Sequence, residues 1–212
     1  MSDFLKTALK CVVPGSNRKA AIESLKECWT HPLNPNHVLP CLSVRTGLDL
    51  YLKVMTFPPG SEVIMSAINI PDMSYIVKEH GLSIVPLDVS LTTVAPKIEN
   101  LEHLITERTK LIILAHVYGK RYDLTPFLTV ARKYRLPVIE DCAEVFTGLD
   151  YTGHPDVDLS MFSFGTIKNN TSFGGAMVKV SLCCFLWPKI YLSFSFSPTH
   201  HIRVLLSPVN NV

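Results

Sequence analysis

The chain has 212 residues, of which 47% are hydrophobic and 18% charged, a composition typical of a globular protein with a substantial core. Its 20 basic and 18 acidic residues nearly cancel and form no long run, so charge gives no reason to expect a nucleic-acid partner. Six cysteines without CxxC spacing or a preceding secretory signal indicate reduced thiols and a cytoplasmic protein. A basic amphipathic segment near the start leaves organelle targeting as an alternative.

Three segments follow one another along the chain. Residues 1–36 are expected to form an N-terminal helical segment, and residues 37–180 alternate short apolar runs with amphipathic ones, the pattern of an α/β domain with a largely parallel sheet. The strands are expected at 37–44, 62–67, 82–87, 111–116, 136–141, 159–164 and 175–180. The helices between them are expected at 46–55, 72–80, 97–107 and 123–135. Because the strands are continuously apolar, we expect helices on both faces of the sheet.

Two of these helices have clear local signals. Asp123 or Thr125 is expected as an N-cap, with Pro126 at the first helical position. The helix of residues 97–107 has apolar residues three and four apart, which indicates one buried face: Ile98, Leu101, Leu104 and Ile105.

The composition changes abruptly after residue 180. Residues 181–212 contain no Asp or Glu, and Lys189 and Arg203 are their only fixed charges. Pro188 and Lys189 interrupt the apolar runs, which fall short of the ~20 residues that a membrane span requires, so no membrane partner is expected. We interpret this segment as a divergent, poorly ordered tail produced by truncation or by an altered reading frame.

Polar residues stand at the ends of three predicted strands, where ligands bind in doubly wound sheets. Thr46 and Gly47 lie between a strand and a helix, Asp141 ends a strand, and Ser163 and Lys168 lie at or just past another. Each feature has an ordinary structural explanation, as a helix cap, an ion pair or a solvent-facing loop lysine.

Together these residues fit a site for pyridoxal phosphate. That cofactor needs an amine for a Schiff base, a carboxylate for its ring nitrogen and an anion-binding turn for its phosphate. Competing sites lack their motifs, since the chain has no GxGxxG after a first strand, no GxxxxGK[ST] and no GxSxG. The eight histidines show no metal-ligand spacing, and no metal site is expected.

The segment "LPVIEDCAEVFTGLDYTGHPDVDLSMFSFGTIKNNTSFGGAMV" resembles the DegT/DnrJ/StrS-type sugar aminotransferases, within the fold type I pyridoxal phosphate enzymes. The likeness runs from about residue 38 to about residue 180 and includes "VRTGLDL" and "GSEVIMSAINI". It implies a three-layer α/β/α large domain with a seven-stranded sheet whose final strand is antiparallel. It also implies amino transfer from a donor such as glutamate to a keto sugar, usually by a homodimer, in polysaccharide or amino-sugar biosynthesis.

The resemblance assigns roles to the strand-end residues. Lys168 would form the Schiff base and move the substrate proton, and Asp141 would pair with the pyridinium nitrogen. Ser163, with Thr46 and Gly47, would hold the phosphate.

Three positions depart from the family pattern. Glu144 replaces the usual glutamine near the ring oxygen, Ile70 stands where an aromatic residue usually stacks on the ring, and Asp49 follows the phosphate turn. The family's C-terminal small domain is also expected to be missing. Three hypotheses therefore remain: a transaminase, a non-catalytic cofactor-binding or dimerising fragment, or an unstable fragment without a selected function.

Overall fold

A single seven-stranded sheet forms the centre of the molecule. The computed structural model describes residues 18–29 and 37–180, and the expectations for 181–212 lie outside them. The strands are β1 (His37–Cys41), β2 (Glu62–Ser66), β3 (Ser83–Leu87), β4 (Thr109–Ala115), β5 (Val138–Asp141), β6 (Leu159–Ser163) and β7 (Ala176–Val180). Their order across the sheet is β1-β7-β6-β5-β4-β2-β3.

The sheet is mostly parallel, as the sequence predicts. Strands β3, β2, β4, β5 and β6 pair in parallel, whereas β7 runs antiparallel to both of its neighbours, β6 and β1. The expected antiparallel final strand is thus confirmed. The seven expected strands all occur, with boundaries within three residues of those expected.

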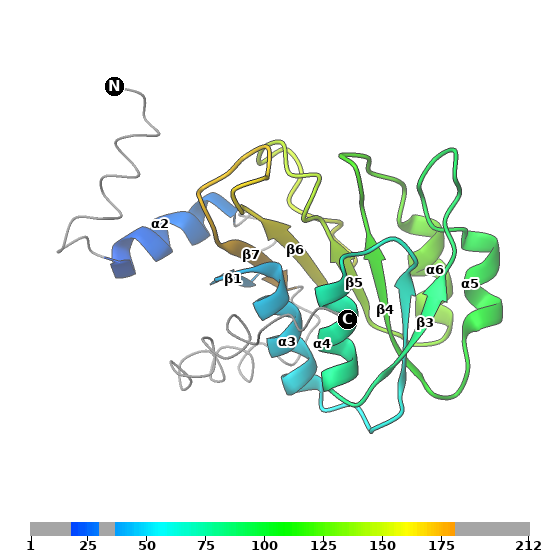
Figure 1. The fold of residues 1–212 in the computed structure, drawn as a ribbon. Helices are drawn as coiled ribbons and strands as arrows, with labels where there is room; N and C mark the ends of the chain where they lie inside the picture. The colour runs from blue at the N-terminus through cyan, green and yellow to red at the C-terminus, as the bar shows by residue number, and fades with distance from the viewer. Residues whose placement is uncertain (1–17, 30–36, 181–212) are drawn as a thin grey trace, which may run out of the picture.

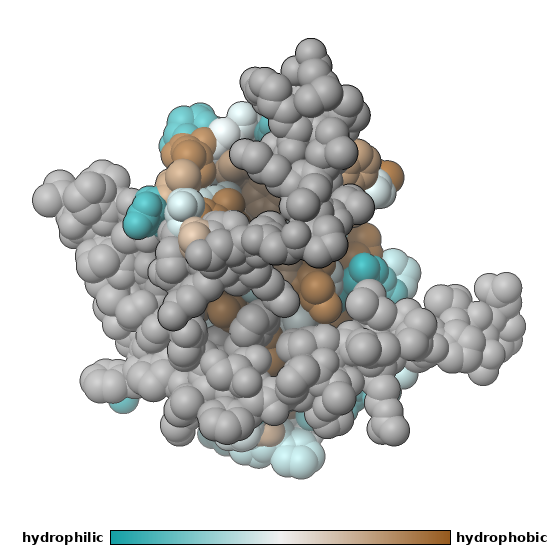
Figure 2. All heavy atoms as spheres, turned by 90° about the vertical axis from the view of Figure 1, so that its left-hand side faces the viewer, coloured by the Kyte–Doolittle hydropathy of each residue, from teal (hydrophilic) through white to brown (hydrophobic). Residues whose placement is uncertain are grey.

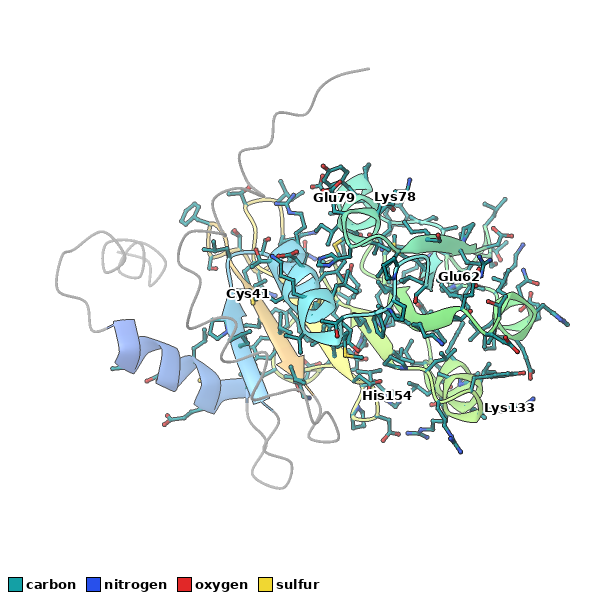
Figure 3. All side chains as sticks on the ribbon, turned by 90° about the horizontal axis from the view of Figure 1, so that it is seen from below. Cys41, Glu62, Lys78, Glu79, Lys133 and His154 are labelled. Atoms are coloured by element: carbon teal, nitrogen blue, oxygen red, sulfur yellow. The ribbon has the colours of Figure 1, made fainter. Side chains whose placement is uncertain are left out.

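Helices cover both faces of the sheet and complete the three layers. The helices are α2 (Arg18–Trp29), α3 (Val44–Met55), α4 (Pro71–Glu79), α5 (Ile98–Leu104) and α6 (Thr125–Lys133). Helices α3 and α4 lie together on one face, and α5 and α6 lie on the other (Figure 1). Figure 3 shows these two layers, with Lys78 and Glu79 of α4 on one side of the sheet and Lys133 of α6 on the other.

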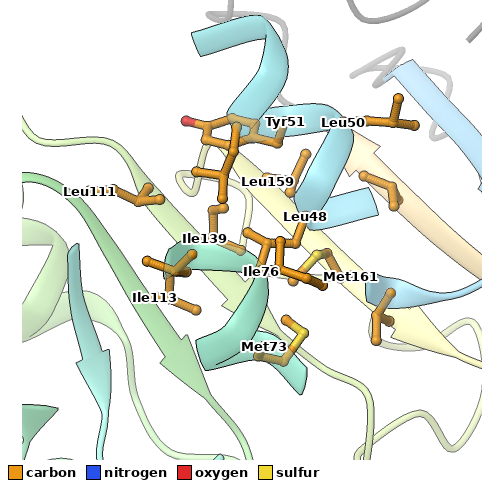
Figure 4. Close-up of a cluster of buried hydrophobic side chains, with 14 of the residues drawn as sticks. Leu48, Leu50, Tyr51, Met73, Ile76, Leu111, Ile113, Ile139, Leu159 and Met161 are labelled. Carbon is orange, nitrogen blue, oxygen red and sulfur yellow. The ribbon is translucent and has the colours of Figure 1, made fainter. Parts of the chain in front are cut away.

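Side-chain alternation divides each central strand between two cores. In β4, Leu111 and Ile113 pack under α3 and α4, whereas Ile112 and Leu114 pack under α5 and α6. Figure 4 shows the first of these cores, in which Leu48 and Tyr51 of α3 and Met73 and Ile76 of α4 meet the sheet. The strands are continuously apolar because both of their faces are buried.

The start of α6 differs from the expected capping. Neither Asp123 nor Thr125 is the N-cap, which is Leu124. The Asp123 carboxylate accepts a hydrogen bond from the Thr125 N–H at 2.9 Å, one residue before the cap, and Pro126 is the second helical residue and not the first as expected. In α5, Leu101 is buried and its predicted apolar neighbours pack against the same core.

Helix α2 joins the sheet through one aromatic residue at its end. Trp29 is buried and stacks on Phe146 with ring centroids 5.2 Å apart, and it meets Phe162 and Phe164 edge-on. Hydrophobic residues are visible among the polar ones on this end of the molecule (Figure 2). Within the described ranges, no helix combines the length and apolar character that crossing a membrane requires.

Gly47 lets α3 approach β7 closely. A Cβ atom at this position would lie 2.6 Å from Val178 Cγ2 and 3.8 Å from Met161 Sδ. Val178 is β-branched and sits in a strand with neighbours on both sides, so its side chain has little freedom to move away. The absence of a side chain at Gly47 is therefore a packing requirement of the fold.

We expect Gly47→Ala to destabilise the protein. Overpacking a core of this kind costs about 1–3 kcal/mol, and the better helix propensity of alanine offsets up to about 1 kcal/mol of that cost. The double variant Gly47→Ala/Val178→Ala should lose less stability than the two single variants together, because the clash is gone. Urea unfolding of the four proteins measures this coupling, and strict additivity would contradict the packing explanation.

Candidate active site

A cavity of about 460 Å³ opens at the carboxyl ends of β2, β4, β5 and β6. Five residues named from the sequence line it together: Asp141, Ser163, Lys168, Glu144 and Ile70. Asp141 ends β5 and Ser163 ends β6, so parallel pairing alone brings these two to the same edge. The strand-end residues therefore line one cavity.

Lys168 sits in a turn that its backbone hydrogen bonds close. The Lys168 N–H donates to the Gly165 carbonyl at 3.0 Å, and the Phe164 carbonyl accepts from the Ser172 N–H at 3.0 Å. The Lys168 side chain is 20% exposed, and its Nζ lies 3.9 Å from Glu144 Oε1. This loop lysine faces the cavity instead of extending into solvent.

Asp141 is a buried carboxylate with an incomplete set of partners. Its Oδ1 accepts a hydrogen bond from the Ala143 N–H at 3.0 Å, the one hydrogen bond it accepts from the described residues. Burial raises the pKa of Asp141 from 3.8 to about 6, although the Ala143 N–H and the Lys168 charge act in the opposite direction. A cationic or N–H donor bound in the cavity would stabilise this carboxylate.

The first turn of α3 offers free backbone donors to the cavity. Ser43 caps the helix, because its Oγ accepts from the Thr46 N–H at 3.2 Å and its carbonyl accepts from the Gly47 N–H at 3.2 Å. The N–H groups of Val44 and Arg45 have no acceptor in the described part of the chain. Such orphan donors at a helix N-terminus suit an anion.

The phosphate-binding role that the resemblance gives to Thr46 and Gly47 stays a prediction. The geometry favours the three residues before them for this role. Ser43, Val44 and Arg45 line the cavity, whereas Thr46 and Gly47 are absent from its wall. Ser43, Val44 and Arg45 were not predicted as site residues, because the helix was expected to start at residue 46, two residues after its observed start at Val44.

The two acidic departures from the family pattern have different surroundings. Asp49 lies away from the cavity wall and binds Lys53 Nζ at 2.6 Å and His80 Nε2 at 3.0 Å. Glu144 does line the cavity, and its Oε2 accepts from the Tyr118 N–H at 2.7 Å. Only the second departure therefore adds negative charge to the site.

A buried polar network lies beneath the cavity on the α6 side of the sheet. The fully buried Glu140 accepts hydrogen bonds from His116 Nε2 at 2.9 Å, the Ser160 hydroxyl at 2.9 Å, the His154 N–H at 2.8 Å and the Tyr151 hydroxyl. Burial alone would raise the pKa of Glu140, but the donors from His116, Tyr151 and His154 hold it at about 2. The network thus fixes an ionised carboxylate inside the fold.

Two nitrogen atoms at the cavity wall are buried and have no hydrogen-bond partner in the part of the chain that the structure describes. They are His116 Nδ1 and Asn69 Nδ2, and both residues line the cavity. Because Glu140 is ionised and can only accept, the Nε2 atom of His116 carries a proton. Neither residue was named from the sequence as part of the site, although Asn69 lies three residues after the end of β2 and His116 directly follows β4, at the edge where ligands bind.

Cys142 lies near His116 and Glu140, with one potential ligand atom of each within 4.8 Å of the others. The group is poorly prepared for a metal ion. Burial raises the pKa of the Cys142 thiol well above its ordinary value, and hydrogen-bond donors already surround the Glu140 oxygens. The cluster is better explained as a structural network.

Comparison with known proteins defines the class. Residues 22–181 match the model of the DegT/DnrJ/EryC1/StrS aminotransferase family, and the chain belongs to this family. It is 33% identical over 155 residues to the UDP-4-amino-4-deoxy-L-arabinose–oxoglutarate aminotransferase of Shewanella sediminis, a match covering 72% of this chain and 40% of that protein. It is 36% identical over 150 residues to the GDP-perosamine synthase of Caulobacter vibrioides, covering 67% and 39%. The chain thus spans about two fifths of the length of these relatives.

Solved structures show the same fold. The putative sugar aminotransferase Spr1654 from Streptococcus pneumoniae, in its PLP form, superposes with a TM-score of 0.76 at 21% identity, covering 92% of this chain and 55% of that one. The 3-amino-5-hydroxybenzoic acid synthase superposes with a TM-score of 0.66 at 26% identity, covering 74% and 41%. The expected large-domain architecture is confirmed.

The raised pKa of Asp141 makes stability depend on pH. Between pH ~4 and ~6 the folded chain holds a proton that the unfolded chain has lost, so this residue lowers stability as the pH rises through that window. We expect Asp141→Asn to be more stable than the wild type at pH 7.5, by up to about 3 kcal/mol. The difference should vanish below pH 4.

Urea unfolding at pH 7.5 and pH 3.5, without added cofactor, measures the difference. Asp156→Asn is the matched control, since this exposed carboxylate pairs only with Arg132 among the described residues. An Asp141→Asn effect that is equal at both pH values would contradict the assignment.

Proposed function

We propose that this chain forms the cofactor-binding half of a pyridoxal phosphate-dependent sugar aminotransferase. The reaction moves an amino group from an amino acid such as glutamate to a keto sugar carried by a nucleotide. The observation that supports it most is the convergence of Lys168, Asp141 and the free donors of α3 on one cavity. The names of the relatives, an oxoglutarate aminotransferase and a GDP-perosamine synthase, supply the substrate class.

The residues present fit the cofactor chemically. Lys168 supplies the amine for covalent attachment, and the Asp141 carboxylate, short of donors, suits the protonated ring nitrogen. The Val44 and Arg45 N–H groups, with the Ser163 hydroxyl at the same wall, suit the phosphate. When bound, pyridoxal phosphate supplies an electron sink for the carbon that carries the amino group.

Each residue then has a defined task. Asp141 would keep a proton on the ring nitrogen of the bound cofactor, because a buried carboxylate is stabilised by a cationic donor. Lys168 Nζ would move a proton at the substrate carbon, and the Glu144 carboxylate, 3.9 Å from Nζ, would stabilise the amine when it is protonated. Ile70, 46% exposed at the cavity wall, would cover one side of the ring with an aliphatic surface.

We further propose that other parts of the complete enzyme cover the open side of the cavity. The relatives extend well beyond the matched segment, and we propose that the keto sugar and a second subunit of a homodimer meet this face of the domain. Large side chains stand exposed there, with Tyr118 69% and Ile167 88% accessible. Both residues line the cavity, so a covering element would also exclude water from it.

A second candidate is a protein that holds the cofactor without turnover. It is favoured by the aliphatic Ile70 in place of a stacking ring and by the negative charge of Glu144 at the cavity wall. Attachment of the cofactor to Lys168 without amino transfer from glutamate would support this second function.

We expect pyridoxal phosphate followed by borohydride to label the chain at Lys168. Peptide mass spectrometry should locate a reduced adduct there, and Lys168→Ala should abolish it. Lys78→Ala is the matched control, since Lys78 is an exposed lysine of α4 outside the cavity wall. Equal labelling of the wild type and Lys168→Ala would overturn the proposal. If Lys168 is labelled, an assay for oxoglutarate formed from glutamate separates the two candidate functions.

A further inference from the structure

Among the described residues that line the cavity, the fixed charges balance because Arg45 is one of them. Lys168 and Arg45 are its cationic lining residues, and Asp141 and Glu144 are its anionic ones. If Arg45 is excluded, a doubly charged phosphate would enter a site of net negative charge. Lys168 offers little compensation, because its amine is committed to the cofactor's carbonyl carbon.

Arg45 occupies an unfavourable place for a cation. It is the second residue of α3, whose first turn contains no acidic side chain, so its charge adds to the positive end of the helix dipole. Asp72 of α4 offsets this, since its Oδ2 lies 2.5 Å from Arg45 Nη1. The pair is solvent-accessible, at 38% and 52% exposure, and an ion pair of this kind contributes little stability. The Arg45 guanidinium can therefore leave Asp72 and bind an anion that interacts with it more strongly.

We propose that Arg45 is a phosphate-binding residue that exchanges Asp72 for the phosphate of the bound cofactor. This inference rests on the proposed function. The guanidinium and the free N–H groups of Val44 and Arg45 belong to the same helical turn at the same cavity wall. Together they offer the several convergent donors that a phosphate monoester, with three terminal oxygens, requires.

Other features of the cavity indicate that a polar ligand occupies it. His116 is 1% exposed, and neither its Nδ1 nor the buried Asn69 Nδ2 has a hydrogen-bond partner within residues 18–29 and 37–180. Buried polar atoms of this kind are costly unless a ligand or water satisfies them. The α3 turn is thus one end of a cavity whose wall is already equipped for polar contacts.

The test compares pyridoxal phosphate with pyridoxal, which lacks the phosphate. Dissociation constants are measured by absorbance, with borohydride trapping at Lys168, for the wild type, Arg45→Gln, Asp72→Asn and Lys53→Gln. Arg45→Gln should weaken pyridoxal phosphate binding about ten- to hundredfold, the loss of a hydrogen bond to a charged group, and leave pyridoxal binding within twofold. Asp72→Asn should keep or improve pyridoxal phosphate binding. Lys53→Gln removes the same charge from α3 outside the cavity and should change neither constant.

A second arm is independent of Lys168 chemistry. In a Lys168→Ala background, inorganic phosphate at 10 mM should raise the thermal midpoint, and Arg45→Gln should remove this shift. Normal Lys168 labelling with an unchanged preference for pyridoxal phosphate in Arg45→Gln would overturn the role of Arg45 alone. No labelling of the wild type, with a phosphate shift that depends on Arg45, would overturn the proposed function and leave an anion site. Loss of both signals would overturn both.

Discussion

The parallel pairing of β4, β5 and β6 fixes where the polar side chains of the site can lie. Ala115 pairs with Asp141, and Asp141 pairs with Met161, so these strands end nearly level with one another. The residues that follow each strand are consequently brought to the same edge, whatever their separation in sequence. Alternation then sends Glu140 to the α6 side of the sheet, while Asp141 ends at the cavity. One register therefore specifies both the buried network and the candidate site.

Much of this arrangement could be predicted, because it follows from hydrophobic pattern and strand order. Lys168 and Asp141 stand at or after strand ends that the apolar runs define, and the structure brings them into one cavity. The start of α3 was predicted two residues late, since Ser43 was not recognised as its cap. The position of the helix start determines which N–H groups are free, and the later start pointed to Thr46 and Gly47 in place of Val44 and Arg45. Free donors depend on the exact boundary of a helix, the least certain part of a sequence-based assignment.

The roles of His116 and Asn69 could not be predicted from the sequence for a different reason. Their positions after β2 and β4 place them near the ligand-binding edge of the sheet, but the sequence does not show that a side-chain nitrogen of each is buried without a partner among the described residues. The support of Lys168 is similarly nonlocal. Trp29, from a helix more than a hundred residues earlier, packs on Phe164, whose backbone closes the lysine turn. The position of the lysine thus depends on contacts that only the folded chain creates.

The groups that make the cavity suitable for a ligand also weaken the ligand-free fold. Among the described residues, Asp141 is buried with few donors, and His116 Nδ1 and Asn69 Nδ2 have no partners, each at a cost on the order of 1–3 kcal/mol. A ligand that satisfies them binds only the folded state, and so it stabilises that state in proportion to its affinity and concentration. Because the net stability of a domain is itself only about 5–15 kcal/mol, occupancy of this cavity would strongly influence whether the chain stays folded.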